Sequence, residues 1–217
     1  METVLKDQLI QGVEHLELNL SDHQIDQLAD YIDLLMKWNK AYNLTAIRDP
    51  KEMVVKHLLD SLSIVSHIDD SPLLDVGTGP GLPGIPLAIT RPDLDITLLD
   101  SNGKKTRFLT QAKVSLKLDN VTVIHGRVED AVSASNTDSD KRYKIVTSRA
   151  FASLSDMVTL ARDTLATGGR FVAMKGVVPE EEISALPDWV SVEEIISLTV
   201  PNLDGERHLI ILKPDAD

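Results

Sequence analysis

A glycine-rich segment and a later aspartate have the spacing of a site for an adenosine-bearing cofactor. Gly77-Thr-Gly-Pro-Gly81 follows the apolar run 73–76 and precedes a segment of helical length. Glycines between a strand and a helix permit a tight turn and close approach of a ligand. Asp100 ends the next apolar run, and a carboxylate there can accept both hydroxyls of a ribose. We therefore predict cofactor contacts at Gly77, Gly79 and Asp100. For the glycines alone, a tight turn in another α/β protein is the alternative.

Two further acidic positions extend this predicted site. Asp75 lies just before the glycines, where a carboxylate would face the positive amino group or sulfonium of a methyl donor. After the apolar run 121–124, the backbone of Val128 and an acid, Glu129 or Asp130, would bind the exocyclic amine of adenine. A helix N-terminus with favourably placed acids explains the latter residues equally well.

Arg149 and Lys175 are the candidates for contact with a substrate. Arg149 follows the run 144–148, and as a fixed cation it would bind guanine O6, an RNA phosphate or a cofactor carboxylate. A structural salt bridge is the alternative. Lys175 follows the run 171–174 and would activate a ribose 2′-hydroxyl, unless it is an ordinary surface charge.

The elements that would position these residues form an α/β pattern. Apolar runs at 73–76, 96–99, 121–124, 145–146 and 171–174 predict strands, and 82–90, 104–118 and 154–165 have helical periodicity. This alternation indicates a mostly parallel sheet covered on both faces. Segments 190–200 and 207–212 predict an antiparallel hairpin at one edge. A Rossmann-like sheet that ends in such a hairpin is typical of class I methyltransferases and favours S-adenosylmethionine over NAD.

The first 70 residues read as helical. Ser21 and Gln24 form a capping-box pattern, and Pro50 follows a potential N-cap at Asp49. We predict two parts: a helical extension, residues 1–70, packed on a Rossmann-like domain, residues 71–217. The polar segment 131–142 reads as an exposed loop.

The net charge of −12 is unevenly distributed. Residues 1–35 carry eight acids and one base, and residues 179–217 carry ten acids and two bases, which leaves a positive middle. The stretch 101–118 contains five basic residues and no acid. It is either a solvated helix face or a phosphate-binding surface. The total charge therefore does not exclude a nucleic-acid substrate.

Absent residues and motifs narrow the chemistry. The chain contains no cysteine, which excludes disulfides, thiolate zinc sites and the covalent route to 5-methylcytosine. No Asn/Asp-Pro-Pro-Tyr/Phe tetrapeptide of the amino-methyltransferases is present. Methylation of a ring nitrogen needs no general base and is the least demanding reaction left. No metal site is predicted. No apolar run is long enough for a membrane span, and the N-terminus does not read as a signal peptide, so we expect a cytoplasmic protein.

Several strings match one family across nearly the whole chain. They are residues 38–45, Lys56-His57 with Asp60-Ser61, residues 75–84, 98–100, 148–152, Lys175-Gly176 and residues 203–208. With them the chain resembles the bacterial 16S rRNA guanine-N7 methyltransferases, the RsmG/GidB family. One departure is Lys56, where arginine is common in the family; lysine keeps the charge but not bidentate phosphate binding.

The resemblance implies methylation of one guanosine at N7 in 16S rRNA, within the small ribosomal subunit or an assembly intermediate. It also implies S-adenosylmethionine contacts at Gly77, Leu82, Val128, Glu129 and Arg149. As RNA-contacting candidates we take Lys56, His57, Lys104, Arg107 and Arg127, although His57 also reads as a packing residue. Two alternatives are a nicotinamide-dependent oxidoreductase and a ribosome-assembly factor that binds rRNA without catalysis.

Overall fold

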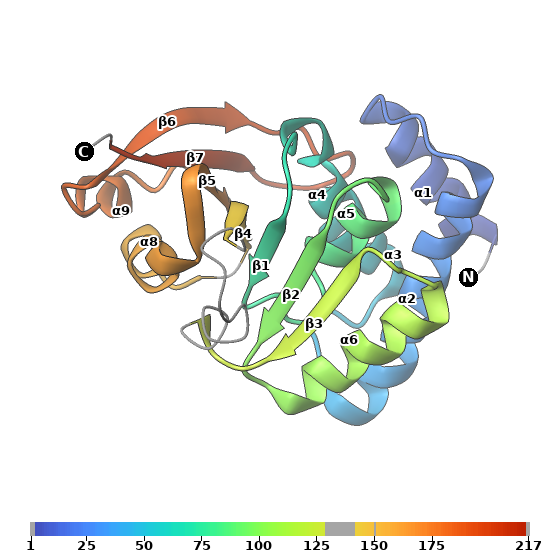
Figure 1. Ribbon diagram of the computed structural model, residues 1–217. Coiled ribbons are helices and arrows are strands. Elements are labelled where there is room, and N and C mark those ends of the chain that lie inside the picture. Colours follow the sequence, from blue (N-terminus) through green and yellow to red (C-terminus); the bar gives the residue numbers. More distant parts are fainter. Residues whose placement is uncertain (1–2, 129–141, 150, 216–217) are drawn as a thin grey trace.

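Seven strands form one mixed sheet in the computed structural model, which describes residues 3–128, 142–149 and 151–215 (Figure 1). The strand order is β3-β2-β1-β4-β5-β7-β6. Strands β1 to β5 are parallel, and β7 runs antiparallel between β5 and β6. The predicted sheet and its terminal antiparallel pair are confirmed. The strands are β1 Leu73–Val76, β2 Ile96–Asp100, β3 Val121–His125, β4 Tyr143–Ser148, β5 Leu165–Lys175, β6 Val190–Ser197 and β7 His208–Pro214.

Helices cover both faces of this sheet. Helices α2, α5 and α6 contribute to a hydrophobic cluster on one face, and α8 contributes to a separate cluster on the other (Figure 1). Neighbouring strand residues divide between the clusters, Leu73 with one and Leu74 with the other, because strand side chains alternate. The helices are α1 Thr3–His15, α2 Asp22–Tyr42, α3 Pro50–Met53, α4 Asp60–Leu62, α5 Gly84–Thr90, α6 Gly103–Leu116, α8 Leu154–Ala161 and α9 Glu180–Ser184. Shorter turns are the π-helix η1 Val54–Leu59 and the 3₁₀ helices η2 Val65–His67 and η4 Arg162–Thr164.

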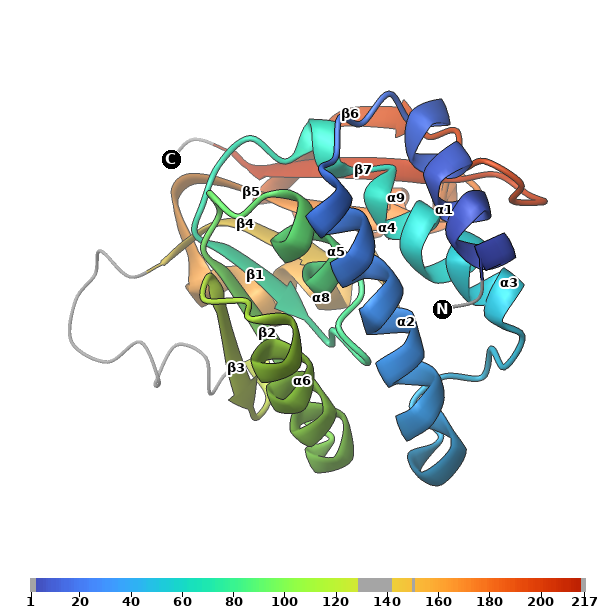
Figure 2. The ribbon, with the colours of Figure 1, turned by 90° about the vertical axis from the view of Figure 1, so that its right-hand side faces the viewer.

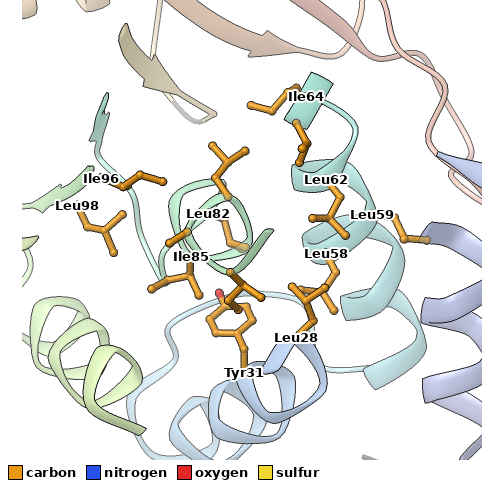
Figure 3. Packing of buried hydrophobic residues seen from close by; sticks show 14 of the residues in the cluster. Leu28, Tyr31, Leu58, Leu59, Leu62, Ile64, Leu82, Ile85, Ile96 and Leu98 are labelled. Atoms are coloured by element: carbon orange, nitrogen blue, oxygen red, sulfur yellow. The ribbon is translucent and has the colours of Figure 1, made fainter. Parts of the chain in front are cut away.

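The N-terminal helices share their core with the sheet. Leu28 of α2 and Leu58 of η1 belong to the same buried cluster as Ile85 of α5 and Leu98 of β2 (Figure 3). The predicted capping box is confirmed, because the Ser21 hydroxyl accepts the Gln24 N–H and the Gln24 side chain accepts the Ser21 N–H. The division into parts 1–70 and 71–217 stays a prediction.

Several element boundaries differ from the sequence prediction; β4, for example, is longer than the predicted 145–146, and β6 ends before residue 200. Helix α5 begins at Gly84 rather than near Leu82, because the residue before a proline, here Pro83, is disfavoured in the α conformation. Helix α8 ends at Ala161 and passes into η4. Strand β5 begins at Leu165, well before the predicted start at Phe171. Its early part contains Gly168-Gly169, which have no side chains and so leave no apolar pattern that would predict a strand. Among the described residues, no helix is long and apolar enough to cross a membrane.

Replacement of a shared core residue tests this packing. Leu58 is fully buried, so Leu58→Ala should lower the free energy of unfolding by about 2–5 kcal/mol. Val114, which is 68% exposed on α6, provides the control, since Val114→Ala should change stability by less than about 0.5 kcal/mol. Urea denaturation of both variants gives the comparison. Equal, small effects would contradict a common core.

Candidate active site

The loop after β1 is an open, glycine-lined turn at the carboxyl edge of the sheet. Gly77 and Gly79 have φ angles of +64° and +63°. Residues other than glycine rarely adopt these values. A Cβ atom added at Gly77 would meet no heavy atom within 4 Å. The backbone at this point is therefore accessible to a ligand. Helix α2 contacts the loop, because the buried Tyr31 hydroxyl donates to the Pro80 carbonyl at 2.9 Å.

Asp75 holds this loop together. Its Oδ2 accepts the Thr78 hydroxyl at 2.6 Å and the Gly84 N–H at 2.8 Å, so one carboxylate oxygen spans the loop from β1 to the start of α5. The side chain is completely buried. We expected Asp75 to face the cofactor. One of its oxygens, Oδ2, is engaged by the turn, and a contact of Oδ1 with the cofactor stays a prediction. Burial raises the pKa of Asp75 to about 7, although the two hydrogen bonds and the charge of Arg149 oppose that rise.

Asp100 ends β2, as predicted, and binds the loop. Its Oδ2 accepts the Gly79 N–H at 2.9 Å, and its Oδ1 accepts the Asn102 N–H at 2.8 Å. Lys105 Nζ is 3.7 Å from Oδ2. A carboxylate offers about four acceptor sites, so Asp100 retains capacity for ribose hydroxyls beside the glycines.

Unpartnered polar atoms support the fit of a polar cofactor. Among the described residues, Ser61 Oγ, Asp75 Oδ1 and Ser148 Oγ are buried without a hydrogen-bond partner. Buried polar atoms are nearly always satisfied, so such exceptions need an explanation. Asp75 and Ser148 lie at or near the carboxyl ends of the adjacent strands β1 and β4. Together with the open cradle at Gly77, these atoms fit the amino-acid and ribose parts of S-adenosylmethionine.

A second feature of this edge is a cavity of about 350 Å³ beside Arg149. Arg149 Nη1 donates to Asp60 Oδ2 at 3.2 Å, and Arg207 Nε donates to Asp60 Oδ1 at 2.8 Å. Asp60 is only 3% exposed. One buried carboxylate thus fixes two arginines that come from distant parts of the chain. The cavity is lined by Ile47, Lys56, His57, Asp60, Arg149, Met174, Lys175, Gly176 and Arg207.

The π-helix η1 brings the backbone into the same network. The Asp60 N–H donates to the Val55 carbonyl five residues back and to His57, rather than to the carbonyl of Lys56 four residues back. The Lys56 carbonyl accepts Arg149 Nη1 at 2.9 Å. Single π-turns inside helices are frequent at functional sites. Here the turn places a carboxylate and a carbonyl on the same guanidinium.

His57 is fixed by two hydrogen bonds within the protein. A carbonyl can only accept, so Nδ1 donates to the Lys56 carbonyl at 3.1 Å, and Nε2 accepts the Thr45 hydroxyl at 2.9 Å. Burial, helped by the charge of Arg149, lowers the pKa of His57 to about 4. The ring is therefore neutral at pH 7. Contact with RNA would require His57 to exchange one of these bonds, and it stays a prediction.

Lys175 is paired with an acid. Its Nζ lies 2.7 Å and 3.1 Å from the two oxygens of Glu182, and Glu182 also accepts the Leu154 N–H. Because Glu182 holds the Lys175 Nζ through these two contacts, this geometry does not favour Lys175 as the residue that activates a ribose hydroxyl.

The remaining predicted residues lie in or after the elements that form the glycine loop and its surroundings. Leu82 is buried in the turn before α5, and Val128 is buried after β3. Lys104 and Arg107 are exposed on α6, which begins just beyond Asp100. Glu129 and the segment 131–141 lie outside the described residues, and Arg127 has an interaction of its own.

Asp60 and Arg207 were not predicted as site residues, although both lie in strings that match the family. Asp60 also lies one helical turn after Lys56, but this spacing by itself indicates no contact with an arginine. Its partners are 89 and 147 residues away, and a single sequence carries no trace of such contacts.

The sheet order and the glycine loop define the fold as that of the class I S-adenosylmethionine-dependent methyltransferases. A solved methyltransferase from Geobacter sulfurreducens, in complex with S-adenosyl-L-homocysteine, has the same fold, with a TM-score of 0.51, 15% identity and coverage of 84% of this chain and 98% of that one. The family model of rRNA small subunit methyltransferase G matches residues 24–210.

Two curated relatives show how close the similarity is. Ribosomal RNA small subunit methyltransferase G of Cronobacter sakazakii is 55% identical over 90% of this chain and 92% of its own length. The protein of that name in Vibrio vulnificus is 49% identical over 97% of both chains. The chain belongs to the rRNA small subunit methyltransferase G family.

The raised pKa of Asp75 predicts an unusual pH dependence of stability. Between the unfolded value of 3.8 and about 7, the native state holds a proton that the unfolded chain has released. The Asp75 contribution to the free energy of unfolding should therefore fall as pH rises through this window. Asp75→Asn cannot ionise, so the variant should gain stability relative to wild type from pH ~4 to pH ~7. His57, whose pKa is lowered, has the opposite effect, but it is common to both proteins and cancels in the difference. Urea unfolding of both proteins without cofactor, at several pH values, measures the difference in their free energies of unfolding. A difference that does not change with pH would contradict the effect of burial on the pKa of Asp75.

Asp100 provides a direct test of cofactor binding. Asp100→Asn should raise the Kd for S-adenosylhomocysteine by about tenfold or more, because a hydrogen bond to a charged acceptor contributes about 1.5–3 kcal/mol. Asp95 is exposed just before the other end of β2, so Asp95→Asn should leave the Kd unchanged. Calorimetric titration measures both. If the two variants bound equally well, Asp100 would not contact the ribose.

Proposed function

We propose that this protein transfers a methyl group from S-adenosylmethionine to N7 of one guanosine in 16S rRNA. Membership of the family supports methylation of small-subunit rRNA. The 16S rRNA would be methylated in the small ribosomal subunit, in an assembly intermediate or as naked RNA, and the protein would act in the cytoplasm. The cofactor would contact Gly77, Gly79, Leu82, Asp100, Val128, Glu129 and Arg149.

The chemistry of guanine N7 suits the side chains of the site. N7 carries an in-plane lone pair and no proton, so its methylation needs a positioned nucleophile and no general base. S-adenosylmethionine supplies an electrophilic methyl group when bound. Among the described residues that line the cavity, His57 has both ring nitrogens engaged and Lys175 is paired with Glu182. These side chains favour a ring nitrogen over a ribose hydroxyl, which would need a base.

The cavity beside Arg149 is the observation that carries the proposal. It lies at the same sheet edge as the glycine loop, because Arg149 follows β4 and Gly77 follows the adjacent β1. Arg149 has five N–H groups, and Asp60 and the Lys56 carbonyl occupy its Nη1. The remaining N–H groups would bind guanine O6 or a phosphate and so orient N7 towards the methyl group. We propose Arg149 as a positioning residue rather than an acid or a base.

Basic residues around the cavity would hold the RNA backbone. Lys56 lies at its rim, with a side chain that is 43% exposed. Lys104 and Arg107 lie on α6 next to the cofactor loop, and Arg127 follows β3. Such contacts would supply the affinity, and the pocket would select the base.

Mapping the methylated position tests this function. Small subunits from cells that lack the protein would be incubated with the protein and labelled S-adenosylmethionine, and N7-methylguanosine would be located by borohydride reduction and aniline cleavage. We expect one cleavage site in 16S rRNA. Label on ribose or on protein would overturn the proposal, and cofactor binding without transfer to any particle would indicate a non-catalytic assembly factor.

Asp60→Asn tests the positioning of Arg149. The variant retains the shape of the side chain and removes the charge that fixes both arginines, so kcat for methylation should fall by about tenfold or more. The matched control is Asp93→Asn, which removes an exposed partner of Arg91 and should leave kcat unchanged.

Loss of a buried ion-pair partner can also destabilise the fold. The thermal midpoint and the Kd for S-adenosylhomocysteine would therefore be measured in parallel. A folded Asp60→Asn protein with wild-type kcat would show that the Asp60 pair is not needed for positioning.

A further inference from the structure

Two segments without acidic residues stand out in this acidic chain. The net charge is −12, yet residues 36–48 contain Lys37, Lys40 and Arg48 and no acid. Residues 101–118 contain Lys104, Lys105, Arg107, Lys113 and Lys117 and no acid. The first segment ends α2 and continues into the loop, and the second forms α6. Acids resume at Asp33 and Asp49 on either side of the first segment.

The fold brings the two segments together. Helices α2 and α6 lie side by side (Figure 2). Gln27, near the start of α2, donates to the Leu116 carbonyl at the end of α6 at 2.7 Å. Further along, the ring of Trp38 packs edge-on against Phe108 with centroids 5.8 Å apart. The helices are therefore antiparallel, and Tyr42, one turn beyond Trp38, lies level with the first turn of α6.

An exposed aromatic ring occupies this basic surface. Tyr42 is 43% exposed, and its ring stacks on Trp38 at a centroid distance of 5.3 Å and an angle of 34°. The two rings border a hollow of about 490 Å³ with Lys37, Ala41, Leu34 and Gln111. Trp38 contacts the buried Phe108 as well as Tyr42, so the Tyr42 ring packs against a side chain that is itself held by the core. Stacking on such a ring costs little conformational entropy.

We propose that the α2–α6 face, defined by Lys37, Lys40, Tyr42, Lys104, Arg107 and Gln111, binds an unpaired nucleotide of the rRNA substrate. The base would stack on Tyr42, and the lysines and Arg107 would contact the adjoining phosphates. Exposed aromatic rings within basic surfaces are the common means of holding single-stranded RNA. Positive charge in an otherwise acidic protein favours a polyanion over a protein partner. The proposal rests on the proposed function.

This surface adjoins the cofactor site. Helix α6 starts directly after Asp100, with Asn102 as its N-cap, and Tyr31 of α2 contacts the glycine loop through Pro80. A nucleotide held on Tyr42 would thus fix an RNA strand whose neighbouring nucleotides approach the cavity beside Arg149. The face would recognise the conformation of the RNA around the target guanosine.

Steady-state kinetics on small ribosomal subunits test the stacking role. Tyr42→Ala should raise the KM for the subunit by about tenfold, equal to about 1.4 kcal/mol and within the range for one stacked base. Neither kcat at saturation nor the Kd for S-adenosylhomocysteine should change, since Tyr42 is outside the reacting centre. Tyr42→Phe keeps the ring and should behave as wild type. A wild-type KM for Tyr42→Ala would overturn the proposal.

Salt dependence tests the phosphate contacts. In Lys37→Gln/Lys40→Gln the slope of log affinity for the subunit against log salt should fall by about 0.7 for each lysine that contacts a phosphate. Lys213 on β7, the strand next to the edge strand β6, provides the control, and Lys213→Gln should leave the slope unchanged. Equal slopes for both variants would exclude a phosphate role for α2.

Ultraviolet crosslinking separates RNA from protein partners. In the wild-type complex the peptide that contains Tyr42 should carry a crosslinked nucleotide, and a crosslink to a ribosomal protein there would overturn the proposal. If wild-type protein transferred no methyl group to the subunit, the proposed function would fail. If transfer proceeded with neither a KM effect nor a crosslink at Tyr42, only the stacking proposal would fail.

Discussion

The carboxylate of Asp75 is the constraint on which the site depends. It is buried at the end of β1 and binds both Thr78 and Gly84, so the chain must turn within a few residues and leave Gly77 exposed on the loop. Asp100 closes the turn from the next strand through the Gly79 N–H. Burial of this acid costs free energy, and the hydrogen bonds that it accepts fix a turn whose backbone is available to a ligand. Gly77, Gly79, Leu82 and Asp100, four of the proposed cofactor contacts, lie in this turn or bind to it.

The N-terminal helices complete the site as well as covering the sheet. Tyr31 supports the loop at Pro80, and the η1 segment supplies Asp60 and the Lys56 carbonyl to Arg149. A Rossmann-like sheet alone would present Arg149 without a partner from this segment. Leu58 and Leu62 lie on either side of Asp60 in the sequence and pack in the common core. Their packing therefore also holds the segment from which Asp60 binds the two arginines.

Local signals predicted most of the fold and those candidate site residues that follow predicted strands. The glycine loop could be predicted because it directly follows an apolar strand, and Asp100 because it ends one. The terminal hairpin could be predicted from two apolar segments on either side of a turn. Strand β5 began earlier than predicted because Gly168-Gly169 has no apolar pattern. Asp60, Arg149 and Arg207 form a cluster only in three dimensions, over separations of 89 and 147 residues. The sequence also gave no sign of the π-helix, which depends on the hydrogen bonds made at one turn. Glu129, predicted from the same reasoning as Val128, lies outside the described residues.

The π-helix at 54–59 also decides which backbone carbonyl is left for Arg149. A π-turn holds one residue more than the α-helical turn it replaces. In a regular α-helix the Asp60 N–H would donate to the Lys56 carbonyl four residues back. Here the Asp60 N–H donates to the Val55 carbonyl, and the Lys56 carbonyl accepts Arg149 Nη1. The extra residue of one turn therefore converts a carbonyl of the helix backbone into a binding partner for a side chain that follows a strand of the sheet.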